Sequence, residues 1–186
     1  MIVAFEGPDK TGKTTSAKHS GDYMYNAVKS HYDAEVATQS HTKGVNVAYD
    51  RIDWLTHMVY RLALPEYEWE DKRIRTVFAA PHMHLVFKLH LPGYEIGDEL
   101  YNLEQSRRVN DMYIRMAGNL IQANRETDFS LFKTISIVYV KPSSGYKLLL
   151  SEFSSPVTEL TYNESIDINS NEKLLELLLM EDAARV

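Results

Sequence analysis

A glycine-rich motif near the start of the chain constrains the fold more than any other feature of the sequence. Residues 7–14 read Gly-Pro-Asp-Lys-Thr-Gly-Lys-Thr, which matches the pattern G-x-x-x-x-G-K-[ST]. The apolar residues 2–5 before the motif predict a short buried strand, and the residues from Thr14 onward predict a helix. A strand that turns through such a motif into a helix is typical of α/β proteins.

The physical chemistry of this motif indicates phosphate binding. Glycine lets the backbone wrap closely around an anion, because a Cβ would block the required backbone angles. Successive N–H groups and the N-terminus of the helix then point at the phosphates. We expect Lys13 to reach the β- and γ-phosphates of ATP, and the Thr14 hydroxyl to ligate Mg²⁺. The residues assigned to ATP binding in this segment are Gly7, Asp9, Thr11, Gly12, Lys13, Thr14 and Thr15.

Composition and charge narrow the class of protein. The 186 residues suit one domain, and 44% hydrophobic and 25% charged residues are typical of a globular chain. The chain has no cysteine, which excludes disulfides and thiolate metal sites, and no apolar stretch approaches the ~18 residues of a membrane span. We therefore expect a cytoplasmic protein. The formal net charge of −6 disfavours nucleic acid as a partner, since backbone binding depends on lysine and arginine.

Alternating apolar and polar segments predict the remaining elements. Further strands are expected over residues 34–40, 45–51 and 84–91, and a C-terminal β-hairpin over 132–141 and 146–153. Helices are expected over residues 14–32, 54–64, 69–80 and 103–124, with a final helix from Asn169. The leucine-rich stretch 174–180 is expected in the core or in a homodimer interface. The whole chain, 1–186, is predicted to be a single α/β domain with a mostly parallel sheet flanked by helices.

An acid and a base end the predicted strand over residues 45–51. Ligands of parallel sheets bind at the carboxyl ends of the strands, so Asp50 and Arg51 should line the same cleft as the glycine-rich motif. Asp50 could hold Mg²⁺, directly or through water, or accept a proton from the attacking oxygen. Arg51 is suited to bidentate contacts with a phosphate or carboxylate of a second substrate. The alternative is that the two form a structural ion pair.

The segment Phe-Glu-Gly-Pro-Asp-Lys-Thr-Gly-Lys-Thr-Thr, followed by Tyr-Asp-Arg at 49–51, resembles thymidylate kinases and related deoxynucleoside monophosphate kinases. Their loop reads F-E-G-x-D-x-x-G-K-[ST]-T. The resemblance implies a P-loop kinase fold and transfer of the γ-phosphoryl group from ATP–Mg²⁺ to a nucleotide, dTMP or a related pyrimidine deoxynucleotide. It also implies that Asp9 contacts the acceptor sugar, and that Asp50 and Arg51 organise the metal and hold the acceptor phosphate.

Lys10 is the most informative position of this resemblance. Some members carry a basic residue there and have a mobile lid without a catalytic arginine. The expected lid here, residues 93–106, contains four acidic residues and no lysine or arginine. Lys10 would then neutralise charge that grows between the donor and acceptor oxygens. The expected catalytic residues are therefore Lys10, Lys13, Asp50 and Arg51, while Arg107 and Arg108 after the lid could close over the ATP phosphates.

The sequence also departs from the family pattern. The interval from Thr14 to Asp50 leaves no room for the segments that supply the family's contacts to the base. We expect the acceptor base to contact Trp54 and Tyr60 instead, although aromatic residues at helical spacing also suit a core. Two other functions remain open: phosphorylation of a hydroxymethylated pyrimidine in DNA, with Asp50 as the base, and a non-catalytic nucleotide-binding regulator.

Overall fold

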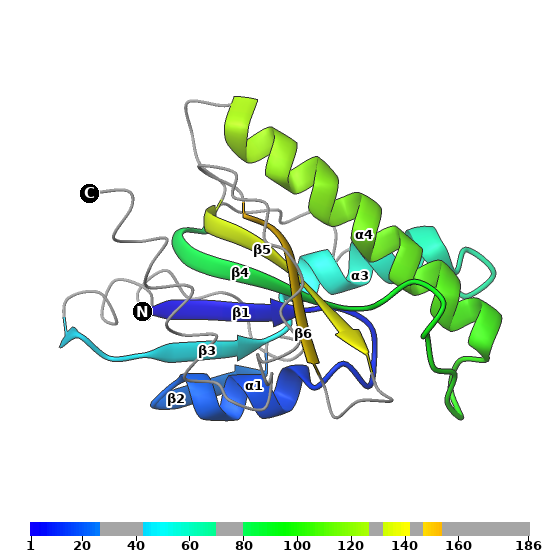
Figure 1. Cartoon of the computed structure of the whole chain (residues 1–186), viewed down its shortest axis with the longest axis horizontal. Helices are drawn as coiled ribbons and strands as arrows, with labels where there is room; N and C mark the ends of the chain where they lie inside the picture. Colours follow the sequence, from blue (N-terminus) through cyan, green and yellow to red (C-terminus); the bar gives the residue numbers. More distant parts are fainter. Residues whose placement is uncertain (27–42, 70–79, 127–131, 142–146, 154–186) are drawn as a thin grey trace.

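The computed structural model of the chain describes residues 1–26, 43–69, 80–126, 132–141 and 147–153 (Figure 1). These residues form a sheet and three helices. The strands are β1 (Ile2–Glu6), β2 (Tyr23–Asn26), β3 (Val47–Asp50), β4 (Ala80–His90), β5 (Phe132–Lys141) and β6 (Lys147–Phe153). The helices are α1 (Lys13–Ser20), α3 (Asp53–Ala63) and α4 (Leu103–Glu126).

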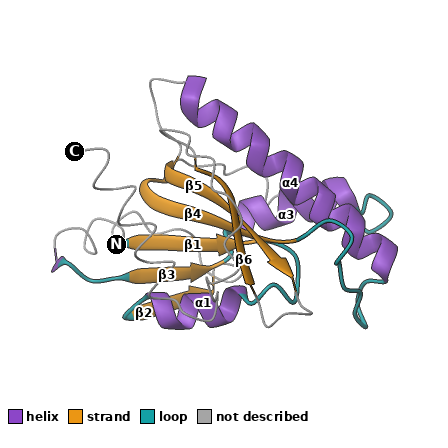
Figure 2. Cartoon of the chain, in the orientation of Figure 1, coloured by secondary structure: helices purple, strands orange, loops and turns teal. Residues whose placement is uncertain are grey.

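The strands form one sheet in the order β2-β3-β1-β4-β5-β6 (Figure 2). The strands from β1 to β5 pair in parallel, and β6 pairs antiparallel with β5. The domain is therefore α/β with a five-stranded parallel sheet and an antiparallel edge strand. In this register Phe5 lies opposite Asp50 on one side of β1, and Glu6 lies opposite Phe87 on the other. The carboxyl ends of the central strands thus meet at one edge.

The helices cover both faces of the sheet. Helix α1 packs on β1 and β3, while α4 packs on β4 and β5 and also contacts α3 (Figure 2). Ile2 and Ala4 of β1 belong to the core cluster shared with α3 and α4. Val3 and Phe5 are fully buried but lie outside that cluster, because successive side chains of a strand point to opposite faces.

Most of the predicted elements that fall on described residues are confirmed. These are the strands predicted over 2–5, 45–51 and 84–91, the hairpin, and the helices over 54–64 and 103–124. Helix α4 begins with a reciprocal pair, in which Gln105 N donates to Asn102 Oδ1 at 2.9 Å and Asn102 N to Gln105 Oε1 at 3.0 Å. This capping box sets the start of α4, so residues 103–106 of the expected lid lie in the first turn of the helix, and the lid itself stays a prediction.

The helix predicted over residues 14–32 is wrong over residues 21–26, and residues 27–32 lie outside the described part of the chain. Gly21 ends α1 in an extended conformation, and β2 follows at once. A Cβ on Gly21 would lie 2.7 Å from Tyr23 O and 2.8 Å from Ala48 N, so the chain needs glycine to approach β3 this closely. Asn46 N donates to Asp22 Oδ2 at 2.9 Å and fixes the start of β2 beside β3. Sheet pairing therefore overrides the local helical preference.

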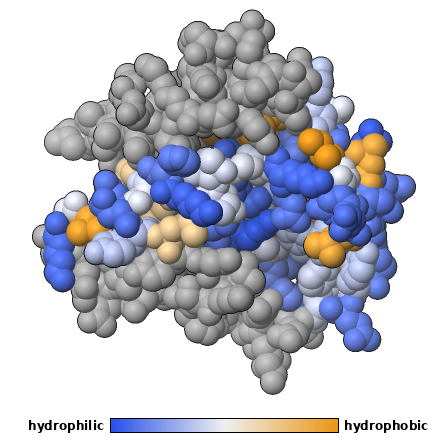
Figure 3. All heavy atoms as spheres, turned by 90° about the horizontal axis from the view of Figure 1, so that it is seen from below, coloured by the Kyte–Doolittle hydropathy of each residue, from blue (hydrophilic) through white to orange (hydrophobic). Residues whose placement is uncertain are grey.

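Several predictions fall outside the described residues. These are the strand over 34–40, nearly all of the helix over 69–80, the final helix from Asn169 and the leucine-rich stretch 174–180. None of the helices in the described part of the chain is long and apolar enough to span a membrane. The described surface seen from below is mostly hydrophilic, with isolated hydrophobic spots (Figure 3), as is normal for a protein surface.

Two glycines provide a matched test of this packing. A Cβ at Gly118, on the exposed side of α4, would meet no atom within 4 Å, whereas a Cβ at Gly7 would lie 1.9 Å from Lys88 O. We expect Gly118→Ala to raise the free energy of unfolding by about 0.5–1 kcal/mol, because alanine favours helix. Gly7→Ala should lower it by about 4 kcal/mol or more. Urea unfolding measures both, and equal stabilities would contradict the tight contact between Gly7 and β4.

Candidate active site

The loop between β1 and α1 adopts a conformation that most residues avoid. Gly7 and Gly12 have φ of 141° and 78°, and Lys10 has φ of 63°. Among the described residues other than glycine, only Lys10 and Arg51 have positive φ. Such strained residues persist only where the surrounding structure holds them, and they gather at functional sites. Both are positions that the sequence assigned to catalysis.

Lys13 folds back over this loop. Its Nζ donates to Pro8 O and, at 3.4 Å, to Thr11 Oγ1, while Thr11 Oγ1 donates to Pro8 O at 3.0 Å. Burial lowers the pKa of Lys13 to about 7, and the nearby charge of Arg51 adds to this effect. The loop is thus closed on itself through bonds among Pro8, Thr11 and Lys13.

Thr14 and Asp50 meet at the mouth of the loop. The Thr14 hydroxyl donates to Asp50 Oδ2 at 2.6 Å. Asp50 is only 8% exposed, and its other oxygen, Oδ1, is buried without a hydrogen-bond partner. A hydroxyl and a carboxylate with an unsatisfied oxygen fit a hard cation such as Mg²⁺, which keeps several waters and phosphate oxygens as further ligands. No cluster of three or more potential metal-binding side chains occurs among the described residues, so the protein alone offers a sparse ligand set.

Arg51 pairs with Asp9 of the loop and not with Asp50. Its Nη2 lies 2.5 Å from Asp9 Oδ1, and its Nη1 donates to Gly7 O at 3.1 Å and to the Tyr113 hydroxyl at 3.4 Å. Burial opposes the charge of Arg51, but Tyr113 and Glu6 outweigh this and raise its pKa above the ordinary value. The guanidinium group therefore stays charged and is tied to the loop through two separate contacts.

Glu6 holds these parts together, and the sequence analysis missed it. The side chain is fully buried. Its Oε1 accepts from Ile52 N at 2.5 Å and from the Thr56 hydroxyl at 2.7 Å. Its Oε2 accepts from Gly7 N at 3.3 Å and from the Tyr113 hydroxyl at 3.0 Å. Burial raises the pKa of Glu6, while the charge of Arg51 opposes that rise. A carboxylate in the apolar run Val-Ala-Phe-Glu-Gly was the available signal.

A cavity opens beside the Arg51–Asp9 pair, with a volume of about 220 Å³. Its lining residues are Asp9, Arg51, Asp53, Thr56, His57, Tyr60, Trp69, Leu100 and Tyr101. The aromatic rings of this wall contact one another, with centroids 5.6 Å apart for Tyr60 and Tyr101 and 6.3 Å apart for Tyr60 and Trp69. The guanidinium of Arg51 lies 6.0 Å from the Tyr60 ring centroid. The cavity thus joins flat apolar surfaces to one cation and two carboxylates.

The two aromatic residues assigned to the acceptor base take different places. Tyr60 lines the cavity. Trp54 is 5% exposed and belongs to the core cluster, outside the cavity lining. Trp69 and Tyr101 complete the wall but were not assigned from the sequence. Trp69 follows α3 and Tyr101 precedes α4, so the two residues are far apart in the chain. Only the fold brings them together.

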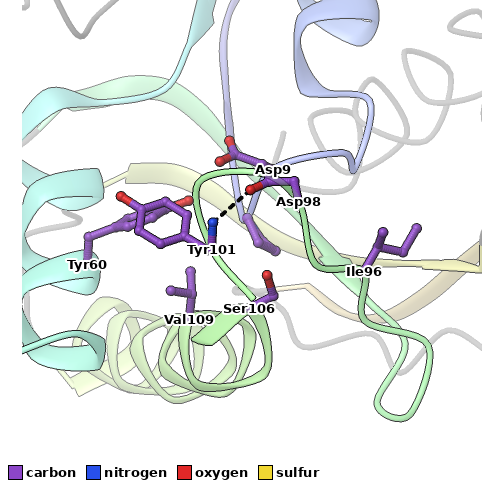
Figure 4. A pocket seen from close by; sticks show the side chains of 8 residues that line it. Asp9, Tyr60, Ile96, Asp98, Tyr101, Ser106 and Val109 are labelled. Atoms are coloured by element: carbon purple, nitrogen blue, oxygen red, sulfur yellow. Dashed lines mark hydrogen bonds between the residues drawn. The ribbon is translucent and has the colours of Figure 1, made fainter. Parts of the chain in front are cut away.

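The expected lid lies against the loop edge. Residues 91–102 connect β4 to α4, and a space of about 10 Å³, near the size of one water, separates this segment from Pro8 and Asp9 (Figure 4). Asp98 Oδ1 accepts from Tyr101 N at 2.9 Å, which fixes the turn that carries Tyr101 (Figure 4). The segment therefore supplies one wall of the aromatic cavity.

The remaining assigned residues lie at the periphery. Arg107 Nε is 3.8 Å from Glu95 Oε2, and Arg108 pairs with Glu66. Neither arginine contacts the loop of residues 7–12 through any of these bonds. Thr15 is exposed in the first turn of α1, and the Lys10 side chain is exposed at the loop crest. Thr11 is buried.

Comparisons with known proteins do not identify a family. No protein-family model matches the chain, and no curated protein matches it. The resemblance to thymidylate kinases therefore stays a prediction.

Replacing Glu6 tests its role as the central acceptor. We expect Glu6→Gln to lower the free energy of unfolding by about 2–4 kcal/mol, because an amide cannot accept all four donors and leaves Arg51 less compensated. Glu68→Gln, at an exposed position, is the control and should change stability by less than about 0.5 kcal/mol. Chemical denaturation measures both, and an unaffected Glu6→Gln variant would show that the four contacts contribute little.

Proposed function

We propose that the protein is an ATP- and Mg²⁺-dependent deoxynucleoside monophosphate kinase that acts on a pyrimidine nucleotide. The observation that carries the proposal is the position of Arg51. Its guanidinium bonds the phosphate-binding loop through Gly7 O and Asp9, and it also lines the aromatic cavity. A donor site and an acceptor site that share one arginine suit transfer between two phosphorylated substrates.

The loop residues account for the donor side. Lys13 would exchange its bond to Pro8 O for the β- and γ-phosphates, whose charge raises the pKa that burial depresses. Lys10, held at the crest with positive φ, can place a second cation near the transferring group. Thr14 and Asp50 would hold Mg²⁺, which supplies charge neutralisation when bound. The buried, unpartnered Asp50 Oδ1 supports this assignment.

The cavity accounts for the acceptor side. Arg51 can form paired contacts with an acceptor phosphate, replacing Asp9 as its partner. A base can stack against the rings of Tyr60, Trp69 and Tyr101. Burial raises the pKa of Tyr60, so its hydroxyl stays neutral and can donate. An acceptor phosphate is already ionised at neutral pH, so Asp50 is needed for the metal rather than as a proton acceptor.

Phosphotransfer from ATP–Mg²⁺ to a panel of nucleoside monophosphates tests the proposal. We expect transfer to one or two pyrimidine deoxynucleotides, and Lys13→Ala should lower kcat/KM by about 10²–10³-fold, because it removes a charge on the transferring group. Lys18→Ala, at an exposed position on the same helix, is the control and should leave the rate unchanged.

Two results of this panel would contradict the proposal. Transfer only to DNA that carries hydroxymethylpyrimidines would change the acceptor and require Asp50 as a base. ATP binding without transfer to any acceptor would instead favour a nucleotide-binding regulator. Both results would still support the assignment of the loop as the ATP site.

Replacing one ring of the cavity tests the acceptor site separately. We expect Tyr101→Leu to raise KM for the acceptor about tenfold while KM for ATP stays unchanged, because the loss affects base stacking alone. Tyr94→Leu is the control, since Tyr94 lies in the same segment, is 41% exposed and does not line the cavity. Steady-state kinetics measure both constants, and a rise in KM for ATP instead would assign the cavity to the donor.

A further inference from the structure

Lys88 places a third ammonium group beside the loop. It stands near the end of β4 and is only 2% exposed. Its Nζ donates to Gly12 O at 3.2 Å and to Ser16 Oγ at 2.6 Å. Both acceptors belong to the turn where the loop becomes α1. The side chain therefore reaches from the sheet to the underside of the phosphate-binding loop.

The charge of Lys88 has no counter-ion in the described part of the chain. Its two acceptors are neutral, and no described carboxylate forms an ion pair with it. Burial lowers the pKa of Lys88 to about 8, and no neighbouring charge modifies this effect. The group is thus still mostly protonated at neutral pH. A buried, unpaired charge is costly, so an apolar side chain would serve better if packing were its only role.

The charge of Lys88 lies against the turn that leads from the loop into α1. Gly12, with φ of 78°, is the residue before α1, and a Cβ there would lie 3.3 Å from Lys88 Nζ. The ammonium therefore touches the turn whose backbone N–H groups face a bound phosphate. Ser16 N donates to Gly12 O at 3.0 Å, the first hydrogen bond of α1. Lys88 therefore bonds both residues that form this hydrogen bond.

We propose that Lys88 is a further positioning residue of the phosphate site, which holds the first turn of α1 and adds a positive charge beneath the loop that strengthens polyphosphate binding. This inference rests on the phosphate-binding loop of the proposed function. Lys88 acts through Gly12 and Ser16 and not by touching the phosphates. The negative charge of the bound polyphosphate then compensates the positive charge of Lys88.

Binding of inorganic tripolyphosphate in the absence of Mg²⁺ isolates this role, because the probe has no base and needs no acceptor. Lys88→Met removes the charge and both bonds, whereas Lys88→Gln removes the charge and keeps a donor. We expect both variants to weaken binding by roughly tenfold or more, because each removes one buried positive charge. Lys18→Met, at an exposed position in the last turn of α1, is the control for net charge and should bind as the parent does.

Urea unfolding of the same variants separates charge from structure. We expect Lys88→Met to be as stable as the parent or more stable, since removal of an unpaired buried charge offsets the loss of its two hydrogen bonds. Weaker binding without lost stability would support the inference. Unchanged binding by folded Lys88→Met, or full binding by Lys88→Gln, would overturn it and leave Lys88 as a brace between β4 and α1.

The parent protein separates this inference from the proposed function. Tripolyphosphate binding that depends on Lys88, without transfer to any nucleotide, would support the inference and reject the kinase. Tripolyphosphate binding that is independent of Lys88, together with phosphotransfer to a nucleotide, would reject the inference and support the kinase. No binding by the parent would overturn both, because the loop would not be a phosphate site.

Discussion

The buried carboxylate of Glu6 is the interaction on which the arrangement of the site depends. It bonds the first N–H of the loop, the N–H that follows Arg51, the start of α3 and the Tyr113 hydroxyl on α4. The start of the loop, the segment 52–56 and Tyr113 of α4 are therefore held together at the end of one strand. Because Glu6 also compensates the charge of Arg51, the guanidinium can stay buried between the loop and the cavity. A buried charge pair of this kind defines position more than it adds stability.

The site is preformed and held in strained backbone conformations. Lys10, at the crest of the loop, and Arg51, in the wall of the cavity, both have positive φ. Their strain is offset by contacts on either side, such as the bond from Arg51 N to Phe5 O at 2.9 Å. Burial depresses the pKa of Lys13 and of Lys88, and the charge of Arg51 adds to the effect on Lys13. A bound polyphosphate would stabilise the charged form of both lysines.

The sequence predicts the features that depend on local pattern. The loop motif, the buried strands around it and the long helix α4 are read from consecutive residues, and the structure confirms these elements. The contacts between distant residues are not predictable in this way. Asp9, and not Asp50, pairs with Arg51 across 42 residues of chain. Trp69 and Tyr101 meet Tyr60 only because α3 and the segment after β4 pack together. The helix after the loop ends early because Gly21 must approach β3, a tertiary requirement that no helical pattern shows.

The fixed ends of the segment over residues 91–102 have a consequence for access to the cavity. Leu91 N donates to Val140 O at 3.0 Å at one end, and the Asn102–Gln105 capping box anchors the other. Any opening must therefore pivot between these two anchors, and it carries Leu100 and Tyr101 out of the cavity wall. The segment that limits access to the cavity therefore also supplies the Tyr101 ring. In the proposed kinase, a nucleotide would have to lose its contact with Tyr101 before leaving, so tight binding would be coupled to slow release.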